Sequence, residues 1–227
     1  MLAEALERLI ARAPAADDAR WVFTTSFGLE DQAITHAIAT AGLAVEIVTL
    51  DTGRLFAETQ ALWAATEARY GLVIAAYAPD ADAVAALVAA DGEYGMYDSK
   101  RARLACCDVR KVAPLARALD GAAGWVTGLR GARGATPPAD LAWDDAHHLW
   151  KANPLAAWPR DAVAAYCTNH AVPVSPLHAR GYPSLGCEPC TRAVKPGEDE
   201  RAGRWWWEQG QVRECGLHVT ATQEERA

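Results

Sequence analysis

The sequence predicts an α/β protein built on a doubly wound, mostly parallel sheet. Patterns typical of buried strands occur at residues 21–27, 44–51, 72–79 and 124–130, and helical patterns follow the first three of them. Strands that alternate with helices form parallel sheets, and ligands bind at the carboxyl ends of such strands. Of the 227 residues, 51% are hydrophobic, which is enough for one large domain with a sizeable core.

The N-terminal stretch is expected to be an amphipathic helix. Leu2, Leu6, Leu9 and Ile10 recur at helical spacing. We expect no signal peptide, because acidic residues come early and no continuous apolar run follows. No stretch approaches the roughly 20 apolar residues of a membrane span. The protein is therefore expected to be cytoplasmic, with no membrane partner.

Each of the first three strands leads into a segment with a helical pattern. The strand at 21–27 runs into EDQAITHAIATAG, and the strand at 44–51 runs into FAETQALWAATEARYG. The strand at 72–79 precedes DADAVAALVAADG, where Asp80 has the side chain of an N-cap residue. The strand at 124–130 closes the set, so the four strands and their helices define one doubly wound sheet.

The remaining segments complete the expected domain organisation. Residues 108–119 continue from a cysteine pair as a helix. After about residue 150 the alternation fades, and the last sixty or so residues are rich in Pro, Gly, Trp and Arg. We therefore expect an α/β domain over residues 1–200 and a C-terminal tail over residues 201–227.

The charge balance limits the partners. The formal net charge is −7, and non-specific binding of nucleic acid needs a basic face, so no nucleic-acid partner is expected. Local arginines can still bind a small anion. Basic residues stand beside strand ends and cysteines, and guanidinium groups suit phosphate and sulfate. They are Arg110, Lys111, Arg130, Arg133, Arg201 and Arg204.

Small or polar residues follow the predicted strands where a ligand would lie. SFGLED follows the first strand and enters a helix, and amides at a helix N-terminus attract phosphate or sulfate. The stretch lacks the lysine of a GxxxxGK[ST] loop, so an ordinary strand-to-helix turn remains open. The candidate ligand-binding residues at these ends are Ser26, Phe27, Gly28, Asp51, Thr52, Gly53, Gly128 and Arg130.

Four of the six cysteines form two pairs. Cys106 and Cys107 are adjacent, and Cys187 and Cys190 lie in CEPC. In a cytosolic protein such thiols indicate metal binding or catalysis, and four thiolates suit either zinc or an iron–sulfur cluster. Adjacent cysteines are unusual zinc ligands, which favours iron–sulfur. The alternative is a redox dithiol at 187 and 190 with a buried pair at 106 and 107.

The other two cysteines differ in their surroundings. Cys167 lies in a largely apolar helical stretch and is expected to be buried and structural. Cys215 precedes a glycine and has Arg213 and His218 close in sequence. Positive charge stabilises a thiolate, which is the nucleophilic form of cysteine. Cys215 is thus a candidate nucleophile, with an inert tail cysteine as the alternative. Trp205, Trp206 and Trp207 are expected to include packing anchors that hold the tail.

Several motifs together carry a family resemblance. They are TSFGLEDQ, LDTGRLFAET, CCDVRKVAPL, KANPLAAW, LHARGYPSLGCEPCTRAVKPGEDERAGRWWWE and ECGLH, which span residues 24 to 218. With them the chain resembles the phosphoadenylyl-sulfate and adenylyl-sulfate reductases of assimilatory sulfate reduction, which feeds cysteine biosynthesis. The cysteine pairs resemble the iron–sulfur branch, which typically uses adenylyl sulfate (APS) rather than its 3′-phosphorylated form (PAPS).

The resemblance implies a fold, a cofactor and a reaction. It implies an adenine nucleotide α-hydrolase-like fold and a 4Fe-4S cluster on Cys106, Cys107, Cys187 and Cys190. It makes Cys215 the nucleophile that attacks the sulfate group of APS, so that AMP leaves and an S-sulfocysteine remains. A thioredoxin or a glutaredoxin-type dithiol then releases sulfite. Lys111 would act between cluster and substrate, and His218 would tune Cys215.

The resemblance also assigns the substrate site. Arg201, Arg204, Lys111 and the amides after Ser26 would stabilise the leaving phosphate. Asp51, Thr52, Gly53 and Gly128 would contact the adenosine. One loop departs from the family, which usually reads GLRRxQSxTR where this chain reads GLRGARGATPP. The changed residues 131–137 leave PAPS as the alternative substrate.

Two other functions are weighed against this one. A nucleotide-activating sulfur transferase of the same fold, such as a tRNA thiolase, would need an SGGxDS loop, whereas this chain has SFGLED. A non-enzymatic iron–sulfur or zinc scaffold would leave Cys215 and the polar strand ends unexplained. Whether the chain forms a homo-oligomer stays open.

Overall fold

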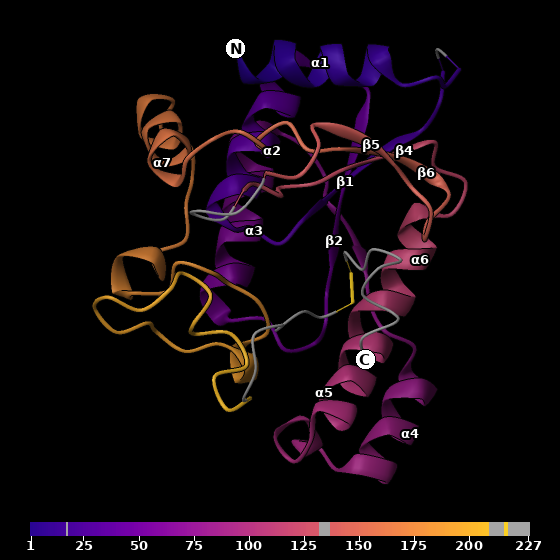
Figure 1. Ribbon diagram of the computed structural model, residues 1–227, viewed down its shortest axis with the longest axis vertical. Coiled ribbons are helices and arrows are strands. Elements are labelled where there is room, and N and C mark those ends of the chain that lie inside the picture. Colours follow the sequence, from indigo (N-terminus) through magenta and orange to yellow (C-terminus); the bar gives the residue numbers. More distant parts are fainter. Residues whose placement is uncertain (17, 132–136, 209–215, 218–227) are drawn as a thin grey trace. The chain divides into compact units, whose positions relative to one another are not determined.

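The computed structural model describes residues 1–16, 18–131, 137–208 and 216–217 (Figure 1). Two compact units make up the chain, and each is described by itself. The first comprises Met1–Thr49, Glu58–Ala75 and Leu119–Ser175, and the second comprises Leu50–Ala57, Ala76–Ala118 and Pro176–Ala227.

The helices and strands follow the predicted alternation. The strands are β1 (Trp21–Thr25), β2 (Val45–Leu50), β3 (Ala75–Tyr77), β4 (Gly124–Val126), β5 (Leu141–Asp144) and β6 (Leu149–Ala152). The α-helices are α1 (Leu2–Arg12), α2 (Leu29–Ala41), α3 (Ala57–Tyr70), α4 (Ala81–Asp91), α5 (Lys100–Cys107), α6 (Ala113–Leu119) and α7 (Arg160–Asn169). Short helices are η1 (Gly95–Tyr97), η2 (Asp108–Val112), η3 (His178–Arg180) and η4 (Glu188–Cys190).

The sheet confirms the predicted fold class. Its six strands run in the order β3-β2-β1-β4-β6-β5. β1 pairs in parallel with β2 and β4, and β4 pairs in parallel with β6. β5 runs antiparallel to β6. A chain that reverses its strand order on either side of β1 is doubly wound.

Two expectations about strands were wrong. The sequence pattern indicated four strands, but β5 and β6 add a hairpin over residues 141–152. These strands have four residues each, too few for a clear periodic pattern. The segment 72–79 was expected to be a buried strand, yet β3 has only three residues and its side chains are exposed or half-buried. Its position at the edge of the sheet explains that exposure.

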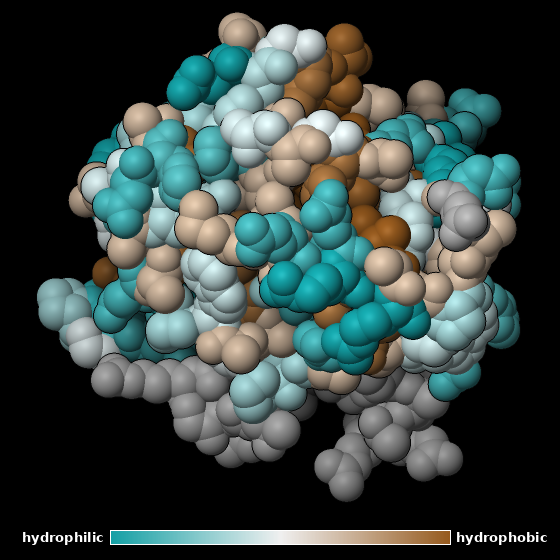
Figure 2. Space-filling model, turned by 90° about the horizontal axis from the view of Figure 1, so that it is seen from above, coloured by the Kyte–Doolittle hydropathy of each residue, from teal (hydrophilic) through white to brown (hydrophobic). Residues whose placement is uncertain are grey.

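The core of the first unit lies against the sheet. α1 contributes Leu2, Leu6 and Leu9, all buried, as the helical spacing predicted. β1 contributes Trp21 and Phe23, which belong to the same cluster of buried residues. Figure 2 views the molecule from the side on which Figure 1 draws α1, and a strip of hydrophobic residues runs between hydrophilic ones. Among the described residues, no helix has the length and apolar content needed to cross a membrane.

In the second unit, α5, η2 and α6 follow one another without a break. The predicted helix at 108–119 is confirmed, but the structure extends it back to Lys100. Ser99 starts α5, because its side chain accepts a hydrogen bond from the Ala102 amide. η2 is a π-helical turn, which inserts extra backbone between two α-helical segments. Asp80 caps α4 in the same unit, as predicted, by accepting from the Ala83 amide.

Candidate functional site

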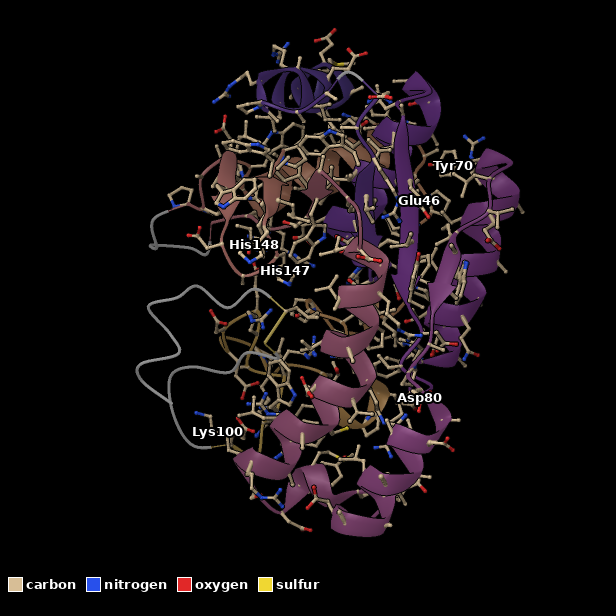
Figure 3. The ribbon with its side chains drawn as sticks, turned by 90° about the vertical axis from the view of Figure 1, so that its right-hand side faces the viewer. Glu46, Tyr70, Asp80, Lys100, His147 and His148 are labelled. Atoms are coloured by element: carbon tan, nitrogen blue, oxygen red, sulfur yellow. The ribbon has the colours of Figure 1, made fainter. Side chains whose placement is uncertain are left out.

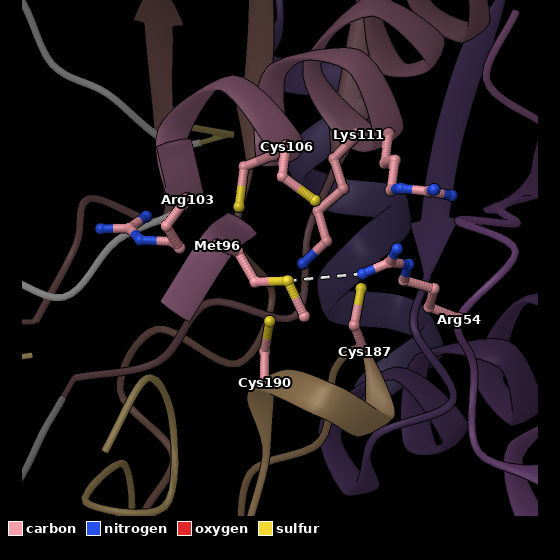
Figure 4. Close-up of a pocket in the computed structure, with 9 residues that line it drawn as sticks. Arg54, Met96, Arg103, Cys106, Lys111, Cys187 and Cys190 are labelled. Atoms are coloured by element: carbon pink, nitrogen blue, oxygen red, sulfur yellow. Dashed lines mark hydrogen bonds between the residues drawn. The ribbon is translucent and has the colours of Figure 1, made fainter. Parts of the chain in front are cut away.

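The four paired cysteines line one pocket in the second unit (Figure 4). Cys106 and Cys107 end α5, and Cys187 and Cys190 flank and end η4. Three of these thiols are buried, and Cys106 is half-buried. The other residues that line the pocket are Met96 and four basic side chains, Arg54, Arg103, Arg110 and Lys111. Two thiol pairs far apart in the sequence therefore share one basic cavity.

Local hydrogen bonds fix the CEPC turn. The Cys190 amide donates to the Cys187 carbonyl at 3.0 Å. The Thr191 hydroxyl donates to the same carbonyl at 2.9 Å. The Tyr97 hydroxyl donates to the Pro189 carbonyl at 2.6 Å, which ties the turn to η1. With its backbone held from both sides, the turn presents both thiols to the pocket (Figure 4).

The π turn η2 places two cations at the pocket. Arg110 and Lys111 lie within η2, directly after Cys107, and both are buried. Neighbouring residues on an α-helix point about 100° apart, so a wider turn helps both to face inward. In Figure 4 the Lys111 side chain extends toward the space between the cysteine pairs.

The two thiols of the CEPC turn have opposite electrostatic surroundings. Burial raises the pKa of Cys187, but Lys111, the Thr52 hydrogen bond, Arg204 and Arg110 outweigh it and lower the pKa overall. Burial and then the neighbouring Cys187 charge raise the pKa of Cys190 to about 12. The cavity thus favours one thiolate at Cys187 and opposes a second one in the absence of further positive charge.

The LDTG loop is bound directly to this pocket. The Cys187 thiol donates to the Thr52 hydroxyl at 3.3 Å, and Arg110 Nη1 donates to the Thr52 carbonyl at 2.8 Å. The Glu188 amide donates to the Arg54 carbonyl at 2.8 Å. Gly53 has a φ of +67°, where glycine is favoured, so the loop turns sharply between Thr52 and Arg54.

Asp51 and Arg54 shape the two ends of that loop. Asp51 Oδ1 accepts from the Gly53 amide at 3.0 Å and so stabilises the turn. The Arg54 guanidinium donates to Met96 Sδ at 3.4 Å and lies 5.5 Å from the centre of the Tyr94 ring. Its side chain is 10% exposed. Arg54 was not among the predicted site residues, although it directly follows the LDTG motif.

A buried ion pair lies beside the same pocket. Arg103 Nε donates to Glu208 Oε1 at 2.7 Å, and the two side chains are 1% and 10% exposed. The Arg103 and Arg204 guanidinium groups each lie 4.7 Å from the Trp205 ring. Trp205 is 1% exposed, and Trp207 packs partly buried against the cluster that contains Trp205, so two of the three tryptophans are packing anchors, as expected, whereas Trp206 is 38% exposed. The sequence signal for Arg103 was its place three residues before Cys106 on one helix face.

Buried donors around the thiols lack partners. Arg110 Nε and Trp205 Nε1 are buried and have no hydrogen-bond acceptor within the described part of the chain. Trp205 packs in one cluster with Cys107, Cys187 and Cys190. Orphaned donors beside thiols fit a bound group with acceptor atoms. In the described ranges, no set of three or more His, Cys, Asp or Glu side chains is arranged to hold a metal ion.

The first unit carries the strand-end residues that follow β1. The Ser26 amide and hydroxyl donate to Asp31 Oδ2 at 2.6 and 2.7 Å. Burial raises the pKa of Asp31 to about 6, and the two Ser26 hydrogen bonds oppose that rise. Gly28 is the N-cap of α2. A Cβ added at Gly128 would lie 2.2 Å from Asp31 Oδ1, so the approach of the two segments requires glycine.

Two predicted residues of this unit have partners within the protein. Phe27, with a φ of +59°, is buried and stacks on Trp63 with ring centres 5.7 Å apart. Arg130 Nε donates to Glu30 Oε1 at 2.6 Å, and Arg160 approaches the same carboxylate at 3.7 Å. The Phe27 side chain therefore packs against the core, and Arg130 forms part of an ion-pair network.

The remaining predicted residues are placed as follows. Cys215 and His218 lie outside the described residues, as does Arg133. Arg204 is buried and donates to the Leu185 carbonyl, whereas Arg201 is exposed. Cys167 is buried in α7, as predicted, and burial raises the pKa of its thiol to about 11.

Comparison with known proteins gives a consistent family. Residues 20–193 match the phosphoadenosine phosphosulfate reductase domain. A protein of Sinorhizobium fredii (strain NBRC 101917 / NGR234) named adenosine 5'-phosphosulfate reductase is 56% identical over 89% of this chain and 81% of its own length. One of the same name from Allochromatium vinosum is 52% identical over 87% and 78%.

A solved structure shows the same fold. The phosphoadenylyl-sulfate (PAPS) reductase of Candida auris, in its phosphate complex, has a TM-score of 0.70 and 25% identity. That match covers 85% of this chain and 90% of the other. Yeast FAD synthetase, with a TM-score of 0.55 and 13% identity over 85% of this chain and 65% of the other, shares the fold alone. The sheet is thus of the adenine nucleotide α-hydrolase-like type.

Proposed function

The chain belongs to the phosphoadenosine phosphosulfate reductase domain family, and on that premise we propose that it reduces APS to sulfite and AMP in sulfate assimilation. The observation that carries the proposal is the pocket in which Cys106, Cys107, Cys187 and Cys190 meet Lys111. Relatives at 52–56% identity bear the name adenosine 5'-phosphosulfate reductase. A solved structure named for PAPS reductase is 25% identical, whereas these APS-named relatives are 52–56% identical, which supports APS as the substrate.

The four thiols are proposed to hold a 4Fe-4S cluster. Each thiolate of such a cluster binds its own iron atom, so the thiols need to line a common cavity rather than converge on one ion. The cluster, when bound, supplies a compact charge whose sulfur atoms accept hydrogen bonds. Within the described residues, Arg110 Nε and Trp205 Nε1 are buried donors without partners beside these thiols, which fits such acceptors.

The first chemical step is assigned to Cys215. Its thiolate attacks the sulfur atom of the sulfate group of APS. An S–S bond forms, the bond from that sulfur to the bridging oxygen breaks, and AMP leaves with the oxygen and its electron pair. His218 is proposed to favour the Cys215 thiolate, because positive charge or a hydrogen bond lowers a thiol pKa. Cys215 then carries the sulfite group as an S-sulfocysteine.

The second step needs an external dithiol of the thioredoxin or glutaredoxin class. One of its thiolates attacks Cys215 Sγ, and sulfite leaves with the electron pair of the broken S–S bond. The second thiol of the partner resolves the mixed disulfide and restores the Cys215 thiol. The dithiol is thereby oxidised to a disulfide by two electrons, which balances the reduction of the sulfate group to sulfite.

Each unit contains residues that are proposed to bind the substrate. In the first unit, the amides after Ser26, with Phe27, Gly28, Gly128 and Arg130, are proposed to contribute to nucleotide binding. The N-terminus of α2 supplies amides suited to an anion. In the second unit, Asp51, Thr52 and Gly53 are proposed to contact adenosine. Lys111, Arg201 and Arg204 are proposed to stabilise negative charge on the leaving phosphate.

The test compares sulfite release from APS and PAPS with thioredoxin and anaerobically purified protein. We expect a strong preference for APS. We expect Cys215→Ser to abolish sulfite release, whereas Cys167→Ser, at a buried structural thiol, retains it. Equal turnover of PAPS would reject the substrate assignment, and turnover by Cys215→Ser would reject the nucleophile.

The cofactor has its own measurement. Cys187→Ser is expected to lose iron, acid-labile sulfide and the visible absorbance of the cluster. Cys167→Ser is the matched control, because it also removes one buried thiol but leaves the pocket complete. Unchanged iron and absorbance in Cys187→Ser would contradict the ligand assignment.

A further inference from the structure

Two histidines and two tyrosines meet within the first unit. His36 lies in α2, Tyr70 ends α3, and Tyr166 and His170 stand at the end of α7 and directly after it. The His36 ring is 5.0 Å from the His170 ring, 5.8 Å from Tyr70 and 5.6 Å from Tyr166, measured between centroids. All four side chains are half-buried, so the cluster is accessible to a small ion. Neither the sequence motifs nor the proposed reaction uses it.

The separation of the two imidazoles suits a shared metal ion. Rings that bind one ion at a metal–nitrogen distance of about 2.1 Å and a bond angle of about 100–110° have centroids about 5 Å apart. His36 and His170 are 5.0 Å apart and tilted by 37°. Of the described His, Cys, Asp and Glu residues, none adds a third ligand to them, so water would complete the coordination.

One ring is already oriented by a hydrogen bond. His36 Nδ1 lies 3.2 Å from the Tyr70 hydroxyl, whose position at the end of α3 is marked in Figure 3. Metal-bound imidazoles commonly use their second nitrogen in such a bond, which fixes the ring and leaves the other nitrogen for the metal. The Tyr70 contact therefore leaves Nε2 as the ligand atom of His36.

Burial and nearby charges favour the neutral imidazole of His36. Burial, then the charges of His170 and Arg69, lower the pKa of His36. The Arg69 guanidinium lies 5.7 Å from the Tyr70 ring centre. In the described part of the chain, no Asp or Glu joins the two imidazoles in a set of three metal ligands, so hard oxygen-seeking cations gain little here. Imidazole ligands instead suit Zn²⁺, Ni²⁺ and Cu²⁺.

We propose that His36 and His170 form a binding site for a late first-row divalent cation, with Tyr70 as a positioning residue. The site would link α2 to the end of α7 and stabilise the first unit. This site is independent of the cysteine pocket and of the reaction proposed above. Its failure would leave that reaction untouched.

The experiment titrates Ni²⁺ into the full-length, cluster-loaded protein under anaerobic conditions, followed by calorimetry. His36→Gln and His170→Gln are each expected to weaken binding at least about 10-fold, and Tyr70→Phe by about 10-fold. His148→Gln is the matched control, because it removes an exposed imidazole from the turn between β5 and β6 (Figure 3). All variants keep the same cysteines, so nickel bound by thiols is common to every titration.

A second measurement covers the case in which a variant fails to fold. In the wild-type protein, paramagnetic Ni²⁺ is expected to broaden the imidazole proton resonances of His36 and His170 before that of His148. Equal nickel affinity in all foldable variants would overturn the site, as would broadening that begins at His148 or at no imidazole.

Discussion

The Cys187 thiol lies 3.3 Å from the Thr52 hydroxyl, so a side-chain bond joins the CEPC turn to the LDTG loop of the second unit. Two further bonds support this link, one from the Glu188 amide to the Arg54 carbonyl and one from Arg110 to the Thr52 carbonyl. A group bound in the cysteine pocket would therefore alter the contacts that hold the LDTG loop, which is proposed to bind nucleotide.

Thr52→Val tests that link. The substitution keeps the shape of the side chain but removes the partner of a buried thiol, which costs about 1–2 kcal/mol. We expect a lower free energy of unfolding and faster loss of visible absorbance in the presence of an iron chelator. Thr52→Ser retains the hydroxyl and is expected to behave like wild type. Equal loss rates in Val and Ser variants would contradict the role of the hydroxyl.

Lys111→Met tests the buried ammonium. Of the charged groups that lower the pKa of Cys187, Lys111 has the largest effect. It is also proposed to stabilise the transition state. We expect the first step, followed as AMP formation in a single turnover, to slow by about 100-fold. Nucleotide affinity is expected to change far less. Lys111→Arg keeps the charge and should recover part of the rate. A loss confined to affinity would contradict this role.

Gly128→Ala tests the close approach of α2 and the segment that follows β4. The added methyl group would lie 2.2 Å from Asp31 Oδ1, and overpacking of this kind costs about 1–3 kcal/mol. We expect a corresponding loss in the free energy of unfolding, measured with urea. In a double-mutant cycle, Asp31→Ala removes the clashing carboxylate and should relieve much of that cost. Strict additivity of the two substitutions would show that the strain arises elsewhere.

Asp31→Asn tests the buried carboxylate through pH. The pKa of Asp31 is raised from 3.8 to about 6, so the folded state binds its proton more tightly than the unfolded state. That contribution to stability is fully present below the unfolded pKa and is lost as pH rises through about 6. The unfolding free energy of wild type relative to Asp31→Asn should therefore fall by about 2 kcal/mol between pH 4 and pH 7.

Parallel urea titrations of the two proteins at several pH values measure this difference. A difference that is constant with pH would contradict the raised pKa of Asp31. Because both proteins share every other titratable group, their remaining pH dependence cancels in the comparison.

The fold was largely accessible from the sequence because its strands and helices alternate with clear periods. β1, β2 and β4 appear as apolar runs, and α2, α3 and α4 follow predicted strands. β5 and β6 were not predicted, because strands of four residues are too short to show a clear alternation of apolar and polar side chains. Asp144 and Lys151 also interrupt their apolar pattern. Those two side chains form an ion pair at 3.0 Å, which the local sequence pattern does not predict.

The cysteine pocket was partly accessible from the sequence. The thiol pairs and Lys111 stand out by residue type, and the structure brings them together. Arg54, Met96 and Arg103 were missed, because their place in the pocket depends on contacts between segments that are distant in sequence. The double role of Thr52, bonded to Cys187 and Arg110, was hidden for the same reason.

The π turn Asp108–Val112 sets a constraint on the length of the chain. Removing one residue there would convert the turn into continuous α-helix, which would leave the phase of α6 nearly unchanged but shift Lys111 by one position relative to Cys106 and Cys107. A change in the number of residues in this stretch would therefore move Lys111 relative to the cysteines that line the same cavity, whereas exchanging a side chain there would not. In a lineage of such chains, insertions and deletions should therefore be absent from these five residues.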